Sequence, residues 1–356
     1  MRRLGRSLLA AALLAAPGGC ASRMTSDAFT FSRTLESGET RVYPALIERP
    51  APREANGYSV LLIGGGYGWD LHWTMPGWYE AEGERVWLTL DGEPTRDADR
   101  IAERLLGEGF TVLRFSSIFE GDPKLDTEKG MMTPVGVPES FALTRDAIDA
   151  FRGRGGFDPE RLLLLGHSLG AARAGVVAQA EDVAGFVLLA GAYVSPTRVP
   201  PTDLSAAALE RYGLADRDGE AWFDEVFGCD SGIELIDHDG DRLLRGWELA
   251  AFDRASGAIE VDDPERIWIA GERWPSAGLL ELDVPVLAVF GGLDPISVHG
   301  PWLEHAGESG ALSSCTVRYF ADRGHNLGAE REGRTGPIAD DVLATICAWL
   351  WETLVR

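Results

Sequence analysis

The chain has 356 residues, of which 45% are hydrophobic and 25% charged. This length and apolar fraction fit one large globular domain with an insertion, and they exclude a disordered chain. Acidic residues outnumber basic residues by 56 to 33, which gives a net charge of -23. Such a charge argues against nucleic acid or another polyanion as a partner.

The first twenty residues have the pattern of an export signal. Three arginines precede the apolar stretch Leu8–Ala16, and small residues follow it. The stretch is too short to cross a bilayer, which needs about 20 apolar residues. With Cys20 behind two glycines, the segment resembles a bacterial lipoprotein signal in which Cys20 is the lipidated residue, although Pro17 stands where leucine is usual. We expect an exported protein, either a lipoprotein of the cell envelope or a secreted protein, whose only link to a membrane is a lipid anchor at Cys20.

Beyond the signal, apolar strands alternate with amphipathic helices. A β-hairpin is expected over Phe29–Ile47. Further strands are expected at Tyr58–Ile63, Phe110–Phe115, Leu162–Leu165, Phe186–Ala190, Pro285–Phe290 and Thr316–Phe320, and helices at Asp97–Leu106, Phe141–Phe151, Leu169–Gln179 and Pro337–Leu354. This alternation predicts an α/β fold with a mostly parallel sheet covered by helices on both faces.

The alternation stops between residues 192 and 282. Segments of helical character that contain Pro, Asp and Trp replace it there, and we expect them to form a helical lid over one edge of the sheet. The expected organisation is a signal at 1–20, a core formed by 27–191 and 283–356, and a lid insertion at 192–282.

The pentapeptide 166–170, Gly-His-Ser-Leu-Gly, contains a candidate nucleophile, Ser168. A Gly-x-Ser-x-Gly match alone has little weight, but this one follows an apolar strand and opens a helix. Strand–turn–helix is the geometry that exposes a serine above the edge of a sheet. The sequence therefore predicts Ser168 as a nucleophile, with a structural turn as the alternative.

A serine nucleophile needs a base to take its proton and an acid to hold the base. Of the six histidines, only His325 lies in a loop directly after the last expected strand. Asp294 has the matching position after the preceding strand, and Asp322 is the second choice for the acid. We expect Ser168, Asp294 and His325 to form a catalytic triad.

Together, the motifs GHSLG, GGLDP and DRGHN resemble those of the α/β-hydrolase superfamily, in the same chain order. The chain looks most similar to bacterial serine esterases and dienelactone-hydrolase-like members. The resemblance implies an α/β-hydrolase fold over about residues 58–350, with the insertion as the variable lid. Two segments depart from those relatives and leave the substrate open: residues 115–117 read Phe-Ser-Ser, and Gly64-Gly65 replaces a His-Gly pair.

An oxyanion hole needs two N–H groups aimed at the developing negative charge. The Leu169 N–H, directly after the nucleophile, is expected to be one of them. The other is expected from the glycine-rich loop after the first core strand, with Gly66 as first choice and Tyr67 as second.

Within the predicted lid, residues 237–248 resemble an EF-hand calcium loop. Acidic residues stand at loop positions one, three, five and twelve, although Arg242 replaces the glycine usual at position six. The expected ligands are Asp237, Asp239, Asp241, the carbonyl of Leu243, and Glu248. The alternative is an acidic surface loop. A bound Ca²⁺ would be structural, because serine chemistry requires no cofactor.

Taken together, the sequence predicts an exported serine hydrolase that cleaves a small-molecule carboxylic ester through an acyl-enzyme. The alternatives are a peptidase, or an acyltransferase or thioesterase, on the same triad, and a non-catalytic envelope binding protein that kept the fold.

Overall fold

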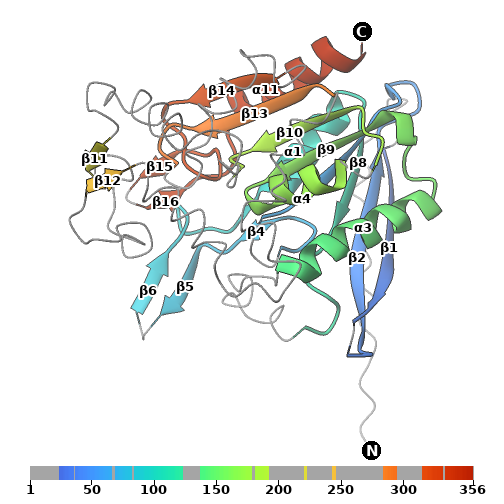
Figure 1. Ribbon diagram of the computed structural model, residues 1–356, viewed down its shortest axis with the longest axis horizontal. Helices are drawn as coiled ribbons and strands as arrows, with labels where there is room; N and C mark the ends of the chain where they lie inside the picture. Colours follow the sequence, from blue (N-terminus) through green and yellow to red (C-terminus); the bar gives the residue numbers. More distant parts are fainter. Residues whose placement is uncertain are drawn as a thin grey trace, which may run out of the picture.

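The computed structural model describes residues 24–35, 37–65, 69–81, 84–122, 137–178, 181–191, 220–222, 243–245, 284–294, 315–331 and 333–355. An eight-stranded sheet lies at the centre of this part of the chain (Figure 1). Its strands, in spatial order, are β1 (Thr25–Thr34), β2 (Thr40–Arg49), β8 (Thr111–Phe115), β3 (Ser59–Ile63), β9 (Leu162–His167), β10 (Gly185–Leu189), β13 (Val286–Gly291) and β14 (Cys315–Phe320).

Neighbouring strands from β8 to β14 all pair in parallel. Strand β2 pairs antiparallel with both β1 and β8, so it is the one reversed strand among the eight described. The central strands β3, β9, β10 and β13 are buried along their whole length, as expected for parallel strands covered on both faces. The predicted mostly parallel sheet is confirmed.

Helices cover both faces of the sheet (Figure 1). On one face, α1 (Asp97–Gly107) and α11 (Asp340–Leu350) pack against one set of strand side chains. On the other face, α3 (Val137–Gly153) and α4 (Leu169–Ala178) pack against the alternate set. The helix predicted at Asp97–Leu106 is confirmed as α1, and its buried side chains are Ala98, Ile101, Ala102, Leu105 and Leu106.

The start of the C-terminal helix was predicted wrongly. The sequence places it at Pro337, but α11 begins at Asp340 with Ala339 as its N-cap. The N–H of Ile338 donates instead to the carboxylate of Asp97 at 2.9 Å, and the N–H of Ala339 donates to the carbonyl of Leu327 at 3.1 Å. These tertiary bonds keep the segment extended before the helix starts. A short π-helical turn, Trp351–Val355, follows α11.

Three short antiparallel pairs were not expected from the sequence. They join β4 (Thr74–Met75) to β7 (Thr95–Arg96), β5 (Trp78–Ala81) to β6 (Glu84–Trp87), and β15 (Glu330–Arg331) to β16 (Arg334–Thr335). Most are too short to display a two-residue period, so the apolar pattern does not reveal them.

Of the predicted lid, the described residues form a strand pair rather than the expected helices. Strand β11 (Glu220–Trp222) pairs antiparallel with β12 (Leu243–Arg245), and Trp222 lies opposite Leu243. The rest of 192–282 lies outside the described residues. Among the helices that the structure describes, none has the length and apolar character needed to cross a bilayer.

Candidate active site

Ser168 lies on the sharp turn between β9 and α4. Its φ of 53° is in the left-handed region that non-glycine residues seldom adopt. Its N–H donates to the carbonyl of Leu189 at 2.9 Å, and its own carbonyl accepts from the N–H of Ala171 at 3.0 Å. These bonds stabilise a strained backbone that presents the hydroxyl at the carboxyl end of the sheet.

Both glycines of the pentapeptide are required by close backbone approach. A Cβ on Gly166 would overlap the Gly170 carbonyl and come within 2.6 Å of the Ala171 nitrogen. A Cβ on Gly170 would overlap the carbonyl oxygens of Ile63 and Gly64. The first turn of α4 therefore packs directly on the end of β3. This close packing explains the glycines two residues before and two residues after Ser168.

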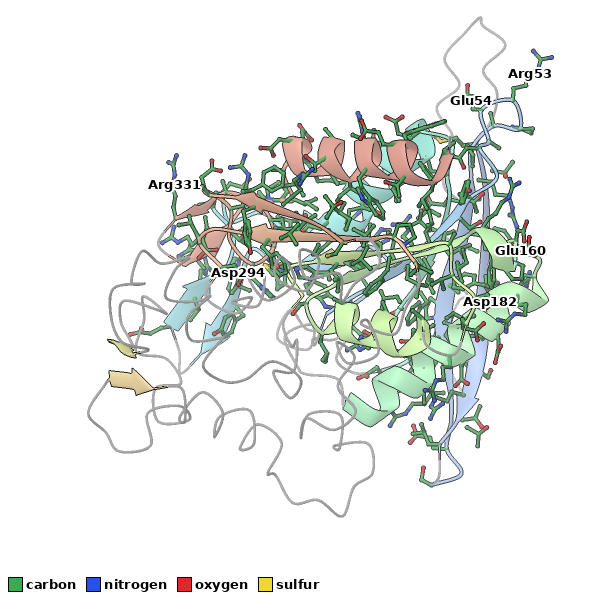
Figure 2. The ribbon with its side chains drawn as sticks, turned by 45° about the horizontal axis from the view of Figure 1, so that its top comes forward. Arg53, Glu54, Glu160, Asp182, Asp294 and Arg331 are labelled. Atoms are coloured by element: carbon green, nitrogen blue, oxygen red, sulfur yellow. The ribbon has the colours of Figure 1, made fainter. Side chains whose placement is uncertain are left out.

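The structure brings the three predicted side chains into one hydrogen-bonded chain. The hydroxyl of Ser168 lies 2.9 Å from Nε2 of His325, and Nδ1 of His325 lies 3.0 Å from Oδ2 of Asp294. Asp294 is 1% exposed. Figure 2 shows Asp294 among the loops after the strands, whereas Glu160 and Asp182, which precede β9 and β10, lie at the opposite end of the sheet.

The loops that carry Asp294 and His325 are bonded to one another. The N–H of Gly292 donates to the carbonyl of Phe320 at 2.8 Å, and the N–H of Leu293 donates to that of Arg323 at 2.9 Å. A Cβ on Gly291 would overlap the carbonyl oxygens of Arg323 and Gly324. Asp294 and His325 are therefore held on two loops that are bonded to each other. Asp322, the second choice for the acid, instead pairs with Arg323 at the surface.

A second histidine, His167, contacts the backbone of the loop that contains His325. Its Nε2 lies 3.1 Å from the backbone carbonyl of His325, which can only accept, so this nitrogen carries the proton. Burial lowers the pKa of His167 to about 4, so its ring is neutral at neutral pH. The sequence analysis did not assign it a role, because its contact depends on the return of a segment 158 residues later.

Glu330, on β15, is a second carboxylate beside His325 that the sequence analysis missed. It accepts a hydrogen bond from the backbone N–H of His325. Its carboxylate lies so close to Gly324 that a Cβ there would overlap it. Burial, followed by repulsion from Asp294, raises the pKa of Glu330 above its ordinary value. A side chain at Gly324 would therefore displace the Glu330 carboxylate from this position.

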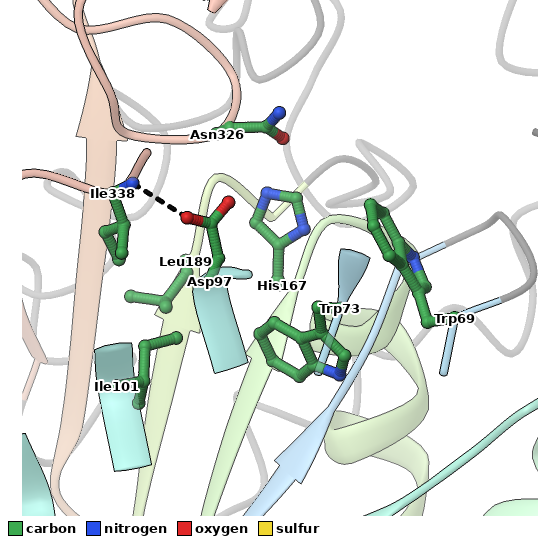
Figure 3. Close-up of a pocket in the computed structure, with 8 residues that line it drawn as sticks. All are labelled: Trp69, Trp73, Asp97, Ile101, His167, Leu189, Asn326 and Ile338. Carbon is green, nitrogen blue, oxygen red and sulfur yellow. Dashed lines mark hydrogen bonds between the residues drawn. The ribbon is translucent and has the colours of Figure 1, made fainter. Parts of the chain in front are cut away.

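A small cavity lies beside the pentapeptide (Figure 3). Trp69 and Trp73 form one side of it, and the His167 ring, the Asp97 carboxylate and the Asn326 side chain face it. Burial raises the pKa of Asp97 to about 6, against the lowering effect of its bond from Ile338. Both tryptophans are buried wall residues, and both belong to the aromatic segment that follows the glycine-rich loop.

Of the predicted oxyanion donors, only Leu169 is among the described residues. It is the first residue of α4, where helix geometry leaves the N–H without an intrahelical acceptor. Gly66 and Tyr67 lie outside the described residues. The preceding Gly65 is adjacent to the nucleophile, since a Cβ on it would lie 3.3 Å from Cβ of Ser168.

The other predicted sites fall mostly outside the described residues. These are Cys20 and the calcium ligands Asp237, Asp239, Asp241 and Glu248. Leu243, the remaining predicted ligand, lies in β12. Within the described ranges, no group of three or more His, Cys, Asp or Glu side chains could hold a metal ion.

No protein-family model matches the chain, and no curated protein matches it in sequence. Among solved structures, the chain is similar to a lipase in an open form, with 13% identity, a TM-score of 0.49, and coverage of 93% of this chain and 100% of that chain. It is also similar to a thermostable carboxyl esterase from Bacillus coagulans, with 14% identity, a TM-score of 0.48, and coverage of 92% and 99%.

A further similar structure is the acylaminoacyl peptidase of Pyrococcus horikoshii, with 11% identity and a TM-score of 0.48. The match covers 94% of this chain but 42% of the peptidase, so the chain spans less than half of that protein's length. The order and direction of the strands, with the serine on the turn after β9 and the aspartate and histidine on loops after β13 and β14, give this chain the α/β-hydrolase fold.

Proposed function

We propose that the protein is a serine hydrolase that cleaves a carboxylic ester. The observation that carries this proposal is the continuous hydrogen-bonded chain from Ser168 through His325 to the buried carboxylate of Asp294. A serine, an imidazole and a buried acid in this order are the parts that nucleophilic acyl transfer requires.

In the first half-reaction, Nε2 of His325 takes the hydroxyl proton while the oxygen of Ser168 attacks the ester carbonyl. The N–H of Leu169 and a second donor from the glycine-rich loop bind the resulting oxyanion. The tetrahedral intermediate collapses when the C–O bond of the leaving group breaks, and His325 gives its proton to the departing alcohol. An acyl group then remains on Ser168.

In the second half-reaction, water loses a proton to His325 and attacks the acyl carbonyl. Collapse of this second intermediate releases the carboxylic acid and returns the proton to Ser168. Asp294 accepts a hydrogen bond from Nδ1 throughout, which fixes the imidazole tautomer and stabilises the imidazolium.

The proposal is tested with a panel of p-nitrophenyl esters of different acyl length and with a fluorophosphonate probe. We expect turnover of at least one ester and covalent labelling at Ser168, both abolished in Ser168→Ala. Faster cleavage of peptides or thioesters than of esters would favour the peptidase or thioesterase alternative. Saturable binding of an ester with neither turnover nor labelling would favour a binding protein.

We also propose that the protein is exported and that Cys20 carries the lipid. The basic, apolar and small-residue order of residues 1–20 supports this proposal. Expression in a bacterial host with a radiolabelled fatty acid should label the full chain, and Cys20→Ser should abolish the label. A labelled Cys20→Ser variant or an unlabelled parent would contradict it.

Calcium binding by residues 237–248 is a separate proposal, supported by the spacing of its acidic residues. Isothermal titration with Ca²⁺ should give a saturable heat that disappears in Asp237→Ala and in Glu248→Ala. An unchanged heat in both variants would rule out this loop. The proposed triad chemistry does not need Ca²⁺. A measurement of ester turnover therefore does not test whether the loop binds calcium.

A further inference from the structure

Arg173 is a buried cation inside the helix that follows the nucleophile. It lies on α4, is 2% exposed, and is among the largest fully buried side chains of the described residues. None of the described carboxylates forms an ion pair with Arg173. Its Nε has no hydrogen-bond partner among the described residues. Burial lowers the pKa of Arg173 to about 9, so the guanidinium remains charged at neutral pH.

The two terminal nitrogens of Arg173 donate to the glycine-rich loop. Nη1 lies 3.0 Å from the carbonyl oxygen of Gly64, and Nη2 lies 2.8 Å from that of Gly65. The fork geometry of a guanidinium suits two adjacent acceptors, which a lysine could not bind in the same way. A single side chain therefore fixes the carbonyls of two consecutive peptide units.

These two peptide units pass directly beside the nucleophile. A Cβ on Gly65 would come within 3.3 Å of Cβ of Ser168 and 3.5 Å of Nδ1 of His167. The peptide bond is planar and trans, so fixing the Gly64 carbonyl also fixes the direction of the Gly65 N–H, which points away from it. In the sequence, Gly65 directly precedes Gly66, the residue predicted to supply the second oxyanion donor.

An arginine here is costly unless it serves the site. Among the described residues no carboxylate compensates the charge of Arg173, and burial of an uncompensated charge is unfavourable. An apolar side chain of similar volume would pack there at lower cost. Arg173 lies one helical turn after Leu169, which supplies the other predicted donor. The N-terminal end of α4 thus follows directly on the turn of Ser168 and contains Leu169, one of the predicted donors. It also contains Arg173, which binds the glycine-rich loop.

We propose that Arg173 is a positioning residue for the oxyanion hole, because it orients the peptide units of Gly64 and Gly65 relative to Ser168. This inference rests on the proposed ester hydrolysis. Arg173 does not contact substrate. Its loss should weaken binding of the transition state more than binding of the substrate, because the donors remain present but misaligned.

The test compares Arg173→Met and Arg173→Lys with the parent on the best ester of the panel. In both variants we expect kcat to fall by about 10- to 100-fold with KM changed less than about threefold, as for a small misplacement of catalytic groups. Phenylboronic acid, which forms a tetrahedral adduct with an active serine, should bind more weakly by a similar factor. The carboxylate product should bind unchanged.

Arg33→Met is the matched control. Arg33 is an arginine that forms an ion pair with Asp146 between β1 and α3, away from Ser168. We expect its kcat and boronate affinity to equal those of the parent.

Unchanged kcat in a folded Arg173→Met or Arg173→Lys, or a loss confined to KM, would overturn the inference. Failure of both variants to fold, as judged by circular dichroism and urea unfolding, would show a structural role and would also overturn it. Failure of the proposed function would appear differently, as an inert parent that the fluorophosphonate probe does not label.

Discussion

The hydroxyl of Ser168 is hydrogen-bonded to Nε2 of His325 at 2.9 Å. This distance is within the range needed for proton transfer between the two side chains. Two further groups, His167 and Glu330, hold the backbone carbonyl and the backbone N–H of the same histidine. Contacts to both the ring and the main chain therefore fix the position of His325.

Asp294→Asn should lower kcat by about 10³- to 10⁴-fold, because the amide no longer stabilises the imidazolium and permits the wrong tautomer. Steady-state ester kinetics measure this loss. The matched control is Asp322→Asn, which changes the exposed acid two residues before Gly324 and should alter kcat by less than about twofold. A larger loss in Asp322→Asn than in Asp294→Asn would show that the acid is misassigned.

Glu330→Gln should stabilise the protein at pH 8 and have little effect at pH 4. Burial and repulsion from Asp294 raise the pKa of Glu330, so the folded state holds its proton more tightly than the unfolded chain does. The stabilising effect is therefore complete below about pH 4 and is lost as the pH rises through the raised pKa. Glutamine keeps an oxygen at this position and removes the titration.

Urea unfolding at pH 4 and pH 8 measures the difference. Glu160→Gln, which changes an exposed carboxylate at the opposite end of the sheet, should leave stability unchanged at both pH values. A gain from Glu330→Gln that does not vary with pH, or an equal gain in both variants, would contradict the proposed electrostatic effect.

At the scale of elements, the close packing of α4 on β3 determines the position of Ser168. Gly170 of α4 lies against the carbonyl oxygens of Ile63 and Gly64, and Arg173 binds the next carbonyl along the chain. The helix and the glycine-rich loop thus form one unit. The relative position of the helix and the loop depends on the absence of a Cβ at Gly170 and on the guanidinium of Arg173, about one helical turn later.

Gly170→Ala should destabilise the protein by about 1 to 3 kcal/mol and reduce ester turnover, because the new methyl group overlaps backbone atoms that cannot move independently. Urea unfolding gives the free energy of unfolding. The matched control is Gly153→Ala at the end of α3, where a Cβ would meet nothing within 4 Å. This change should be neutral or stabilise by about 0.5 kcal/mol, as alanine favours a helix. Equal effects of the two substitutions would contradict the steric argument.

At the scale of the whole molecule, the two halves of the core are joined around the site. The carboxylate of Asp97, at the start of α1, accepts a hydrogen bond from the N–H of Ile338 before α11, and both residues line the cavity beside His167 (Figure 3). This bond fixes the position of the chain just after the loop of His325. It also places a carboxyl group where burial raises its pKa to about 6.

The raised pKa makes stability depend on pH. The folded state holds the Asp97 proton more tightly than the unfolded chain, whose aspartates titrate at about 3.9. The stabilising effect is therefore complete below about pH 4 and is lost as the pH rises through about 6. Asp97→Asn keeps an oxygen for Ile338 and removes the titration, so it should stabilise the protein by about 1 to 2 kcal/mol at pH 8 and by about zero at pH 4.

Urea unfolding at pH 4, 6 and 8 measures the difference. Asp182→Asn, an exposed aspartate before β10, is the control and should change stability at none of these pH values. A gain from Asp97→Asn that does not vary with pH would show that burial of the charge is not its cause.

The sequence by itself determined the strand–helix alternation, the position of Ser168 on the turn after β9, and the meeting of Asp294 and His325 with it at one edge of the sheet. The reason is that the carboxyl ends of parallel strands meet at one edge of the sheet, so residues directly after buried strands converge there. Chain order and strand ends were sufficient, and no contact had to be known.

Only the tertiary structure decided the roles of His167, Arg173 and Glu330 and the true start of α11. Each depends on a contact between segments that no local periodicity encodes: a carbonyl 158 residues away for His167, two glycine carbonyls 109 and 108 residues away for Arg173, and the return of β15 toward Gly324 for Glu330. Helix and strand patterns report which face of an element is buried. They do not report which buried polar group will be satisfied by which distant backbone atom, because that is settled when the elements pack.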